Sequence, residues 1–172
     1  MNDSPPTTLP VRITGLPPVI GIATETLILG SFPSVLSLFR RGYYANPRNQ
    51  FWRIIGQILG IDHRLPYTVR IALLADQHIA LWDVVHSCCR KGSADAAIRD
   101  PEFNDIAGLL NSHRTIRCIL LNGSTAGKYF ARINHCLPEL VTVDVLPSTS
   151  PANARYTFAE KVRRWEVIRP LI

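Results

Sequence analysis

The strongest constraint on the fold is a series of four short apolar runs, each ending at residues typical of a turn. The runs are Thr26–Leu29, His78–Trp82, Arg117–Leu121 and Leu140–Leu146, followed by Gly30, Asp83, Asn122-Gly123 and Pro147. The first three show no strict alternation of apolar and polar residues, which is typical of strands covered on both faces. Four strands are therefore expected, the first three of them covered on both faces.

Segments with helical spacing lie between these runs. The predicted helices are Phe51–Leu59 closed by Gly60, one that follows Pro101, one from Ser124 through Ile133, and a last one that begins near residues 151–153. Strands that alternate with helices predict an α/β fold, with a central four-stranded parallel sheet in three α/β/α layers. In such a sheet the carboxyl ends of the strands meet at one edge, where ligands bind.

Length and composition limit the organisation of the chain. Its 172 residues predict one domain over residues 13–172, after a proline-rich segment, residues 1–12, that is expected to be disordered. A net charge of +6 agrees with a polyanionic partner without proving one. The N-terminus has no apolar signal region and no transmembrane run, and the four cysteines suit reduced thiols. A cytoplasmic protein that is not secreted is expected.

The sequence lacks the motifs of several common catalytic and binding sites. The stretch Gly123–Tyr129 approaches a phosphate-binding loop but has three residues where four are needed, and Tyr129 replaces the required hydroxyl. No Gly-x-Ser-x-Gly nucleophile turn occurs. The histidines and cysteines have no metal-ligand spacing, so neither a metal nor a cofactor is expected.

The loop after the first strand is rich in aromatic and amide side chains. Tyr44 suits stacking on a flat base, although Tyr43-Tyr44 also suits a packing pair in the core. Asn49 precedes the Phe51 helix, where it can serve as a helix cap or hold a ligand. Asp83 can accept hydrogen bonds from ring N–H groups or cap a turn.

The loop after the fourth strand reads Leu146-Pro147-Ser148-Thr149-Ser150-Pro151-Ala152-Asn153. Three hydroxyls in a stiff proline frame suit phosphate oxygens. A rigid capping loop without a ligand is the alternative.

Together these segments resemble the uracil-DNA glycosylase superfamily, and most closely its deoxyinosine (hypoxanthine)-DNA glycosylase branch. The likeness rests on the strings Tyr-Tyr-Ala-Asn-Pro-Arg-Asn-Gln-Phe-Trp and Leu-Pro-Ser-Thr-Ser-Pro-Ala, together with Leu27–Pro33, Leu81–Asp83 and Arg90–Asp95. It spans about residues 16–169 and implies a uracil-DNA glycosylase-like fold.

The resemblance implies a role for each matching residue. Ser31 and Phe32 stand where other branches carry a catalytic Asp or Asn, so the catalytic amide is expected at Asn49. Leu146 stands where other branches often have His. The base-binding residues implied are Gly30, Ser31, Phe32, Tyr44, Asp83 and Asn122. The DNA-binding residues implied are Arg48, Ser148, Thr149, Ser150, Pro151, Ala152 and Asn153.

The implied activity is monofunctional hydrolysis of the N-glycosidic bond of a deaminated base, hypoxanthine or uracil, in double-stranded DNA. The base is flipped out of the helix, and an abasic site remains. A monomer is expected, associated with the nucleoid in a prokaryote. Two alternatives stay open: a non-catalytic protein that binds damaged DNA or a nucleotide through the same edge, and a hydrolase of free nucleotides. Ser34, where the branch usually has Gly, leaves the preferred base open.

Overall fold

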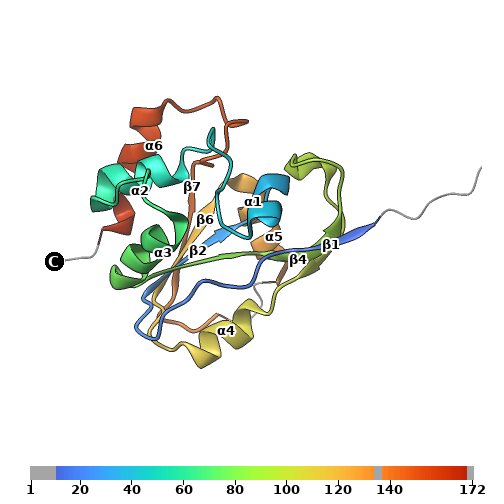
Figure 1. Ribbon diagram of the computed structural model, residues 1–172. Coiled ribbons are helices and arrows are strands. Elements are labelled where there is room, and N and C mark those ends of the chain that lie inside the picture. Colours follow the sequence, from blue (N-terminus) through green and yellow to red (C-terminus); the bar gives the residue numbers. More distant parts are fainter. Residues whose placement is uncertain (1–10, 134–136, 170–172) are drawn as a thin grey trace, which may run out of the picture.

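The four predicted strands form one parallel sheet at the centre of the computed structural model, which describes residues 11–133 and 137–169 (Figure 1). The strands are β2 (Thr26–Gly30), β3 (Ile79–Asp83), β6 (Cys118–Asn122) and β7 (Thr142–Leu146). Their order in the sheet is β3-β2-β6-β7, and every neighbouring pair is parallel. The predicted central sheet is confirmed.

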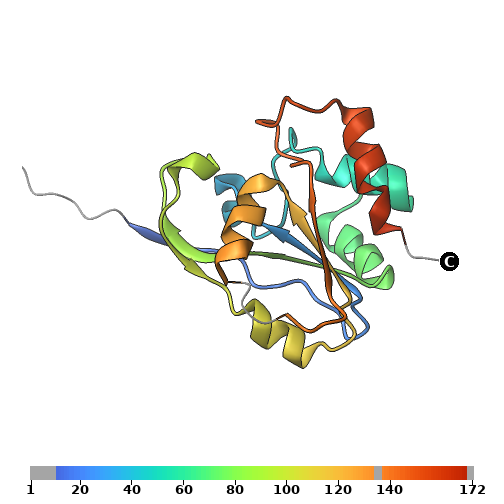
Figure 2. The same cartoon turned by 180° about the vertical axis from the view of Figure 1, so that it is seen from behind.

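Helices cover both faces of this sheet, which confirms the three-layer prediction (Figures 1 and 2). One face packs against α2 (Phe51–Leu59), α3 (Tyr67–Asp76) and α6 (Phe158–Trp165). The other packs against α4 (Ile106–Ser112) and α5 (Ser124–Ile133). A short helix α1 (Val35–Arg40) follows β2, and a 3-10 turn η2 (Glu166–Ile168) follows α6.

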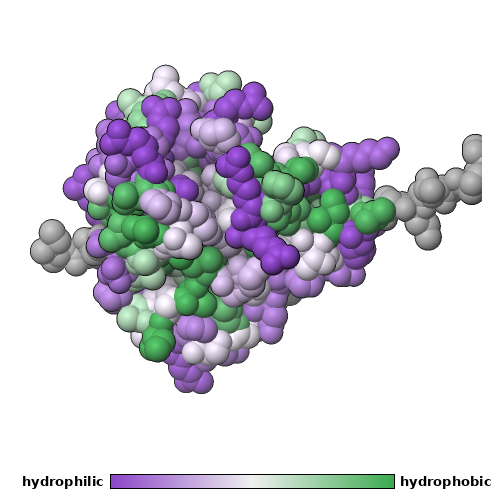
Figure 3. Space-filling model, viewed as in Figure 1, coloured by the Kyte–Doolittle hydropathy of each residue, from purple (hydrophilic) through white to green (hydrophobic). Residues whose placement is uncertain are grey.

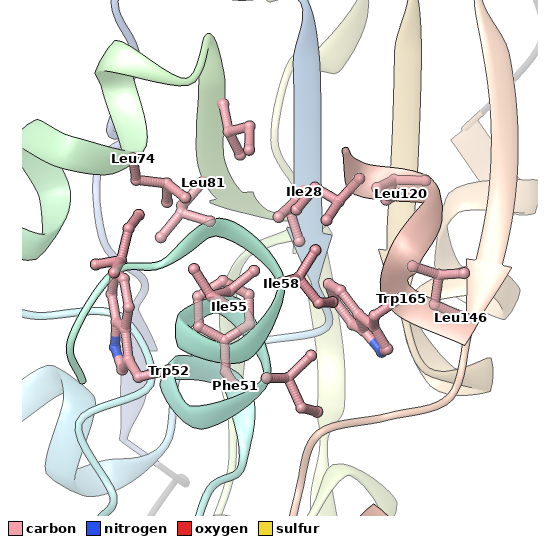
Figure 4. Packing of buried hydrophobic residues seen from close by; sticks show 14 of the residues in the cluster. Ile28, Phe51, Trp52, Ile55, Ile58, Leu74, Leu81, Leu120, Leu146 and Trp165 are labelled. Atoms are coloured by element: carbon pink, nitrogen blue, oxygen red, sulfur yellow. The ribbon is translucent and has the colours of Figure 1, made fainter. Parts of the chain in front are cut away.

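Helix α2 anchors the first layer through its apolar face. Phe51, Ile55 and Ile58 point toward the sheet, and Trp165 of α6 packs beside them (Figure 4). Phe51 and Trp165 have no exposed surface, and their rings meet edge to face at 5.9 Å between centroids. The helix ends where predicted, at Gly60 with a φ of 75°. This packing fixes the start of α2 beside the carboxyl ends of the strands.

A second, antiparallel sheet was not predicted. It consists of β1 (Arg12–Thr14), β4 (Val85–Cys89) and β5 (Arg99–Phe103), in the order β1-β4-β5. A 3-10 turn η1 (Asp95–Ala97) connects β4 to β5. The helix expected after Pro101 is confirmed as α4, with Ile106 and Leu110 buried and Leu109 packed against the core; it starts at Ile106 because Pro101 lies within β5. The Asp105 side chain caps that start by accepting from the Gly108 N–H.

The predicted start of the last helix is wrong. The last helix starts at Phe158 instead of near residues 151–153, because Thr157 and Glu160 form a capping box at that point. Residues 1–10 of the predicted disordered segment lie outside the described residues, but Arg12 belongs to β1 and pairs with Cys89. Among the described helices, none is long and apolar enough to cross a membrane.

Candidate active site

A pocket of about 590 Å³ opens at the carboxyl ends of the central strands. It brings together all the predicted site residues except Arg48 and Pro151. Both of these are exposed beside it, on the loops that also supply Asn49 and Ala152. Segments far apart in the sequence thus meet where the parallel topology predicts.

Gly30 permits two polar groups to converge at the end of β2. A Cβ atom added to Gly30 would lie 2.3 Å from Asp83 Oδ1 and 3.5 Å from the Tyr44 hydroxyl. The position of Asp83 is set by the pairing of β3 with β2, since Gly30 and Asp83 are register partners. A side chain at position 30 would displace the carboxyl group, so glycine is required here by close approach.

Asp83 is a buried carboxyl group with an unused oxygen. The residue is 4% exposed, and its Oδ2 has no hydrogen-bond partner among the described residues. Burial, reinforced by the nearby Asp95, raises the pKa of Asp83 from 3.8 to about 8, although Arg90 opposes the rise. At neutral pH the group is therefore mostly a neutral acid, which can both donate and accept a hydrogen bond.

Tyr44 is held in an unusual backbone conformation. Its φ is 55°, in the left-handed region that bulky residues rarely adopt. Its ring stacks on Phe51, with 3.9 Å between centroids and 21° between planes. Its hydroxyl is buried without a partner among the described residues, and burial together with Asp83 raises its pKa. Strained backbone and unsatisfied buried groups concentrate at functional sites.

Asn49 acts at the start of α2. Its Oδ1 accepts a hydrogen bond of 2.9 Å from the Phe51 N–H, so the side chain serves one of the free backbone donors of the helix. An amide oxygen has two lone pairs, and one of them stays available for a water molecule. The capping role and the predicted catalytic role are thus compatible in one side chain.

Asn122 fastens the loop after β7 to the end of β6. Its Oδ1 accepts from the Thr149 N–H and its Nδ2 donates to Thr149 Oγ1, both at 2.9 Å. Thr149 is 0% exposed, so its hydroxyl cannot reach a phosphate. The prediction that Thr149 binds DNA is corrected: its side chain holds the loop in place.

Further bonds make residues 147–153 a rigid unit. Trp165 Nε1 donates to the Pro147 carbonyl at 2.9 Å, and Asn153 Nδ2 donates to the Ser148 carbonyl at 3.0 Å. The Lys161 ammonium, almost fully buried, donates at 2.9 Å to Gln50 Oε1 and to the Asn153 carbonyl. We call residues 147–153 the anchored loop.

The connection between β4 and β5 supplies pocket residues that sequence reasoning did not assign. Ser31 Oγ donates to Asp95 Oδ1 at 2.7 Å, and Ser93 and Asp95 line the pocket. Arg90 donates to the Pro33 carbonyl, and its guanidinium group lies 4.8 Å from the centre of the Phe32 ring. The resemblance had pointed to Arg90–Asp95 without giving these residues roles. In the described part of the chain, no group of three or more His, Cys, Asp or Glu residues is placed to hold a metal ion.

Comparison with known proteins decides the family. The model of the "Uracil DNA glycosylase superfamily" matches residues 17–169. The chain belongs to the uracil-DNA glycosylase superfamily. The resemblance expected from the two sequence strings is confirmed.

Individual members of the superfamily match most of the chain. A hypoxanthine DNA glycosylase of Methanosarcina acetivorans is 38% identical over 155 residues, which cover 90% of this chain and 96% of that protein. One from Methanosarcina barkeri is 40% identical over 142 residues, covering 82% and 88%. A solution NMR structure from Methanosarcina acetivorans, provisionally described as a uracil DNA glycosylase, has a TM-score of 0.75 and 34% identity over 92% of this chain and 99% of that one.

The raised pKa of Asp83 predicts a pH-dependent stability for this superfamily member. The unfolded chain releases the proton near pH 3.8 and the folded chain only near pH 8, so the free energy of unfolding should fall as pH rises between these values. Asp83→Asn removes this contribution. Denaturant titrations at about pH 5 and about pH 8 measure this change. Between the two pH values the free energy of unfolding should fall less for the variant than for the wild type. Equal losses would contradict the assignment.

The clamp between Asn122 and Thr149 predicts a stability loss. Asn122→Ala leaves two buried polar groups of Thr149 without partners, which should cost roughly 1–3 kcal/mol or more in the free energy of unfolding. Ser150→Ala is the matched control in the same loop, because among the described residues the Ser150 side chain makes a single, exposed hydrogen bond, which it accepts from the Ala152 N–H. Its cost should stay within about 0.5 kcal/mol. Equal losses in chemical denaturation would refute the clamp.

Proposed function

We propose that this chain is a monofunctional DNA glycosylase, which flips a deaminated base out of double-stranded DNA into the pocket and hydrolyses its N-glycosidic bond. Hypoxanthine is the first expected substrate. The observation that carries the proposal is the match along 82–90% of the chain to two relatives named hypoxanthine DNA glycosylase. The convergence of Tyr44, Asn49 and Asp83 in one pocket supports it.

The Tyr44 ring and the Asp83 carboxyl group account for recognition of the base. One face of the Tyr44 ring is covered by Phe51, and the base stacks on the other. A neutral Asp83 carboxyl group donates to a base carbonyl and accepts from the adjacent ring N–H. This donor and acceptor pair matches the N–H and C=O that hypoxanthine, uracil and xanthine share, and Asp83 lines the pocket.

Hydrolysis depends on the orientation of a water molecule. The Asn49 amide does not titrate near neutral pH, so it acts by holding the water through its carbonyl oxygen and not as a base. Leu146 lines the pocket where other branches often place His, so the protein offers no imidazole to the leaving base from that side. Catalysis rests on position and on preorganised dipoles, which predicts slow turnover.

No Schiff base with the sugar is expected. Among the described pocket-lining residues none is a lysine, and the Lys161 ammonium is held by Gln50 and Asn153. The product is therefore an intact abasic site. The expected monomeric state, cytoplasmic location and association with the nucleoid stay predictions.

A non-catalytic protein that binds damaged DNA on the same fold is the second candidate. It is favoured by Ser31, which stands in the turn where other branches carry a catalytic residue and whose hydroxyl is bonded to Asp95. Release of free base from duplex DNA separates the two candidates, because only a glycosylase produces it.

The assignment of Asn49 predicts the outcome of that experiment. The wild type should release hypoxanthine from a duplex that carries one deoxyinosine, and Asn49→Ala should release none while it still binds the duplex. The assay measures free base under single-turnover conditions, with uracil and xanthine duplexes in parallel.

Asn49→Ser is the control for the capping role. Serine keeps a side-chain oxygen that can cap α2 but shortens the reach into the pocket. It should retain the stability of the wild type and lose excision. Excision at the wild-type rate by Asn49→Ser would show that Asn49 is only a cap.

Stacking on Tyr44 predicts a graded effect on base capture. Tyr44→Ala should lower kcat/KM by roughly 5- to 150-fold, since stacking on one base is worth about 1–3 kcal/mol. Tyr44→Phe keeps the ring and should retain most of the activity. An unchanged kcat/KM in Tyr44→Ala would reduce Tyr44 to a packing residue.

A further inference from the structure

Two arginines and a tyrosine form a cationic surface at the edge of the pocket. The Arg155 guanidinium lies 5.5 Å from the centre of the Tyr156 ring, and the Arg164 guanidinium lies 5.0 Å from the same centre. All three residues line the pocket, although none belongs to a predicted motif. We call these three residues the arginine shelf.

Stacking leaves the useful edge of each guanidinium free. A guanidinium that lies over an aromatic ring uses its face, while its N–H donors stay in the plane. Those donors match the oxygens of a phosphate group. The Tyr156 ring also restricts both long side chains, which lowers the entropy lost when they bind a ligand.

The positive charge of the arginine shelf is not neutralised by ion pairs. Within residues 11–133 and 137–169, neither Arg155 nor Arg164 forms a salt bridge. The carboxylate of Glu160 lies one helical turn before Arg164, but its Oε2 accepts at 2.8 Å from both the N–H and the hydroxyl of Thr157. The shelf is therefore suited to an anion from outside the protein.

The shelf is built onto the anchored loop. The Arg155 N–H donates to Asn153 Oδ1 at 3.3 Å, and Lys161, one turn before Arg164 on α6, holds the Asn153 carbonyl. Hydrophilic residues predominate on the surface over α6 and the segment that leads into it (Figure 3). Two guanidinium groups are thus fixed next to the loop expected to meet DNA.

We propose that Arg155 and Arg164, supported by Tyr156, bind phosphates of the DNA strand beside the flipped nucleotide. The ligand is the phosphodiester backbone, so the contribution is independent of sequence and of base damage. The inference rests on the proposed function, because it takes DNA to be the ligand of the pocket. It extends the DNA interface from the anchored loop to helix α6.

The experiment compares two neighbouring arginines on α6. Arg164→Gln removes a shelf residue, and Arg163→Gln removes the same charge from an exposed residue that does not line the pocket. Affinity for an undamaged duplex is measured by fluorescence anisotropy across a range of salt concentrations. The slope of log K against log salt should decrease by about one unit for Arg164→Gln and stay at the wild-type value for Arg163→Gln.

Variants of Tyr156 test the support that the ring provides. Tyr156→Phe keeps the ring and should bind DNA like the wild type, whereas Tyr156→Leu should bind more weakly although every charge is retained. Thermal melting checks that each variant is folded. Equal effects of the two arginine variants, or no loss with Tyr156→Leu, would overturn the proposal.

The binding assay separates this proposal from the proposed function. Undamaged DNA requires no base release, so the shelf can be confirmed even if the wild type excises nothing.

Discussion

The structure depends on the complete burial of strand β2. Leu27, Ile28 and Leu29 have no exposed surface, because helices cover both faces of the sheet and β3 and β6 flank the strand. The backbone of such a strand can satisfy its hydrogen bonds only in a fixed register with both neighbours. That register sets Gly30 opposite Asp83, and the rest of the pocket is assembled around this pair.

The polar groups of the site fall into two kinds. Asn122 and Thr149 satisfy one another and hold the backbone, as buried polar networks do when every member has a partner. Asp83 Oδ2 and the Tyr44 hydroxyl are buried and have no hydrogen-bond partner within the described part of the chain. The satisfied pair fixes the loop after β7 across the pocket that Tyr44 and Asp83 also line.

The sequence predicted those parts of the molecule whose burial leaves a pattern of apolar residues along the chain. The apolar runs revealed the parallel sheet, and the apolar spacing from Phe51 to Leu59 predicted helix α2, with Asn49 as a candidate cap at its start. Strand β5 was missed because it is mostly exposed and contains Pro101, so neither apolar content nor alternation marks it. The start of α6 carried a readable signal in Thr157 and Glu160. The stacking of Arg164 on Tyr156 depends on tertiary contact between residues eight apart and had no local signal.

The anchored loop also separates the fold from the surface that we propose meets DNA. Its supports attach at Pro147, Thr149 and Asn153, whereas Pro151 and Ala152 are exposed between them. The tip therefore contributes little to stability and is free to vary while the base pocket keeps its shape. Exchanging these two residues, or lengthening the tip, would change the proposed contact with a duplex and leave the pocket residues in place.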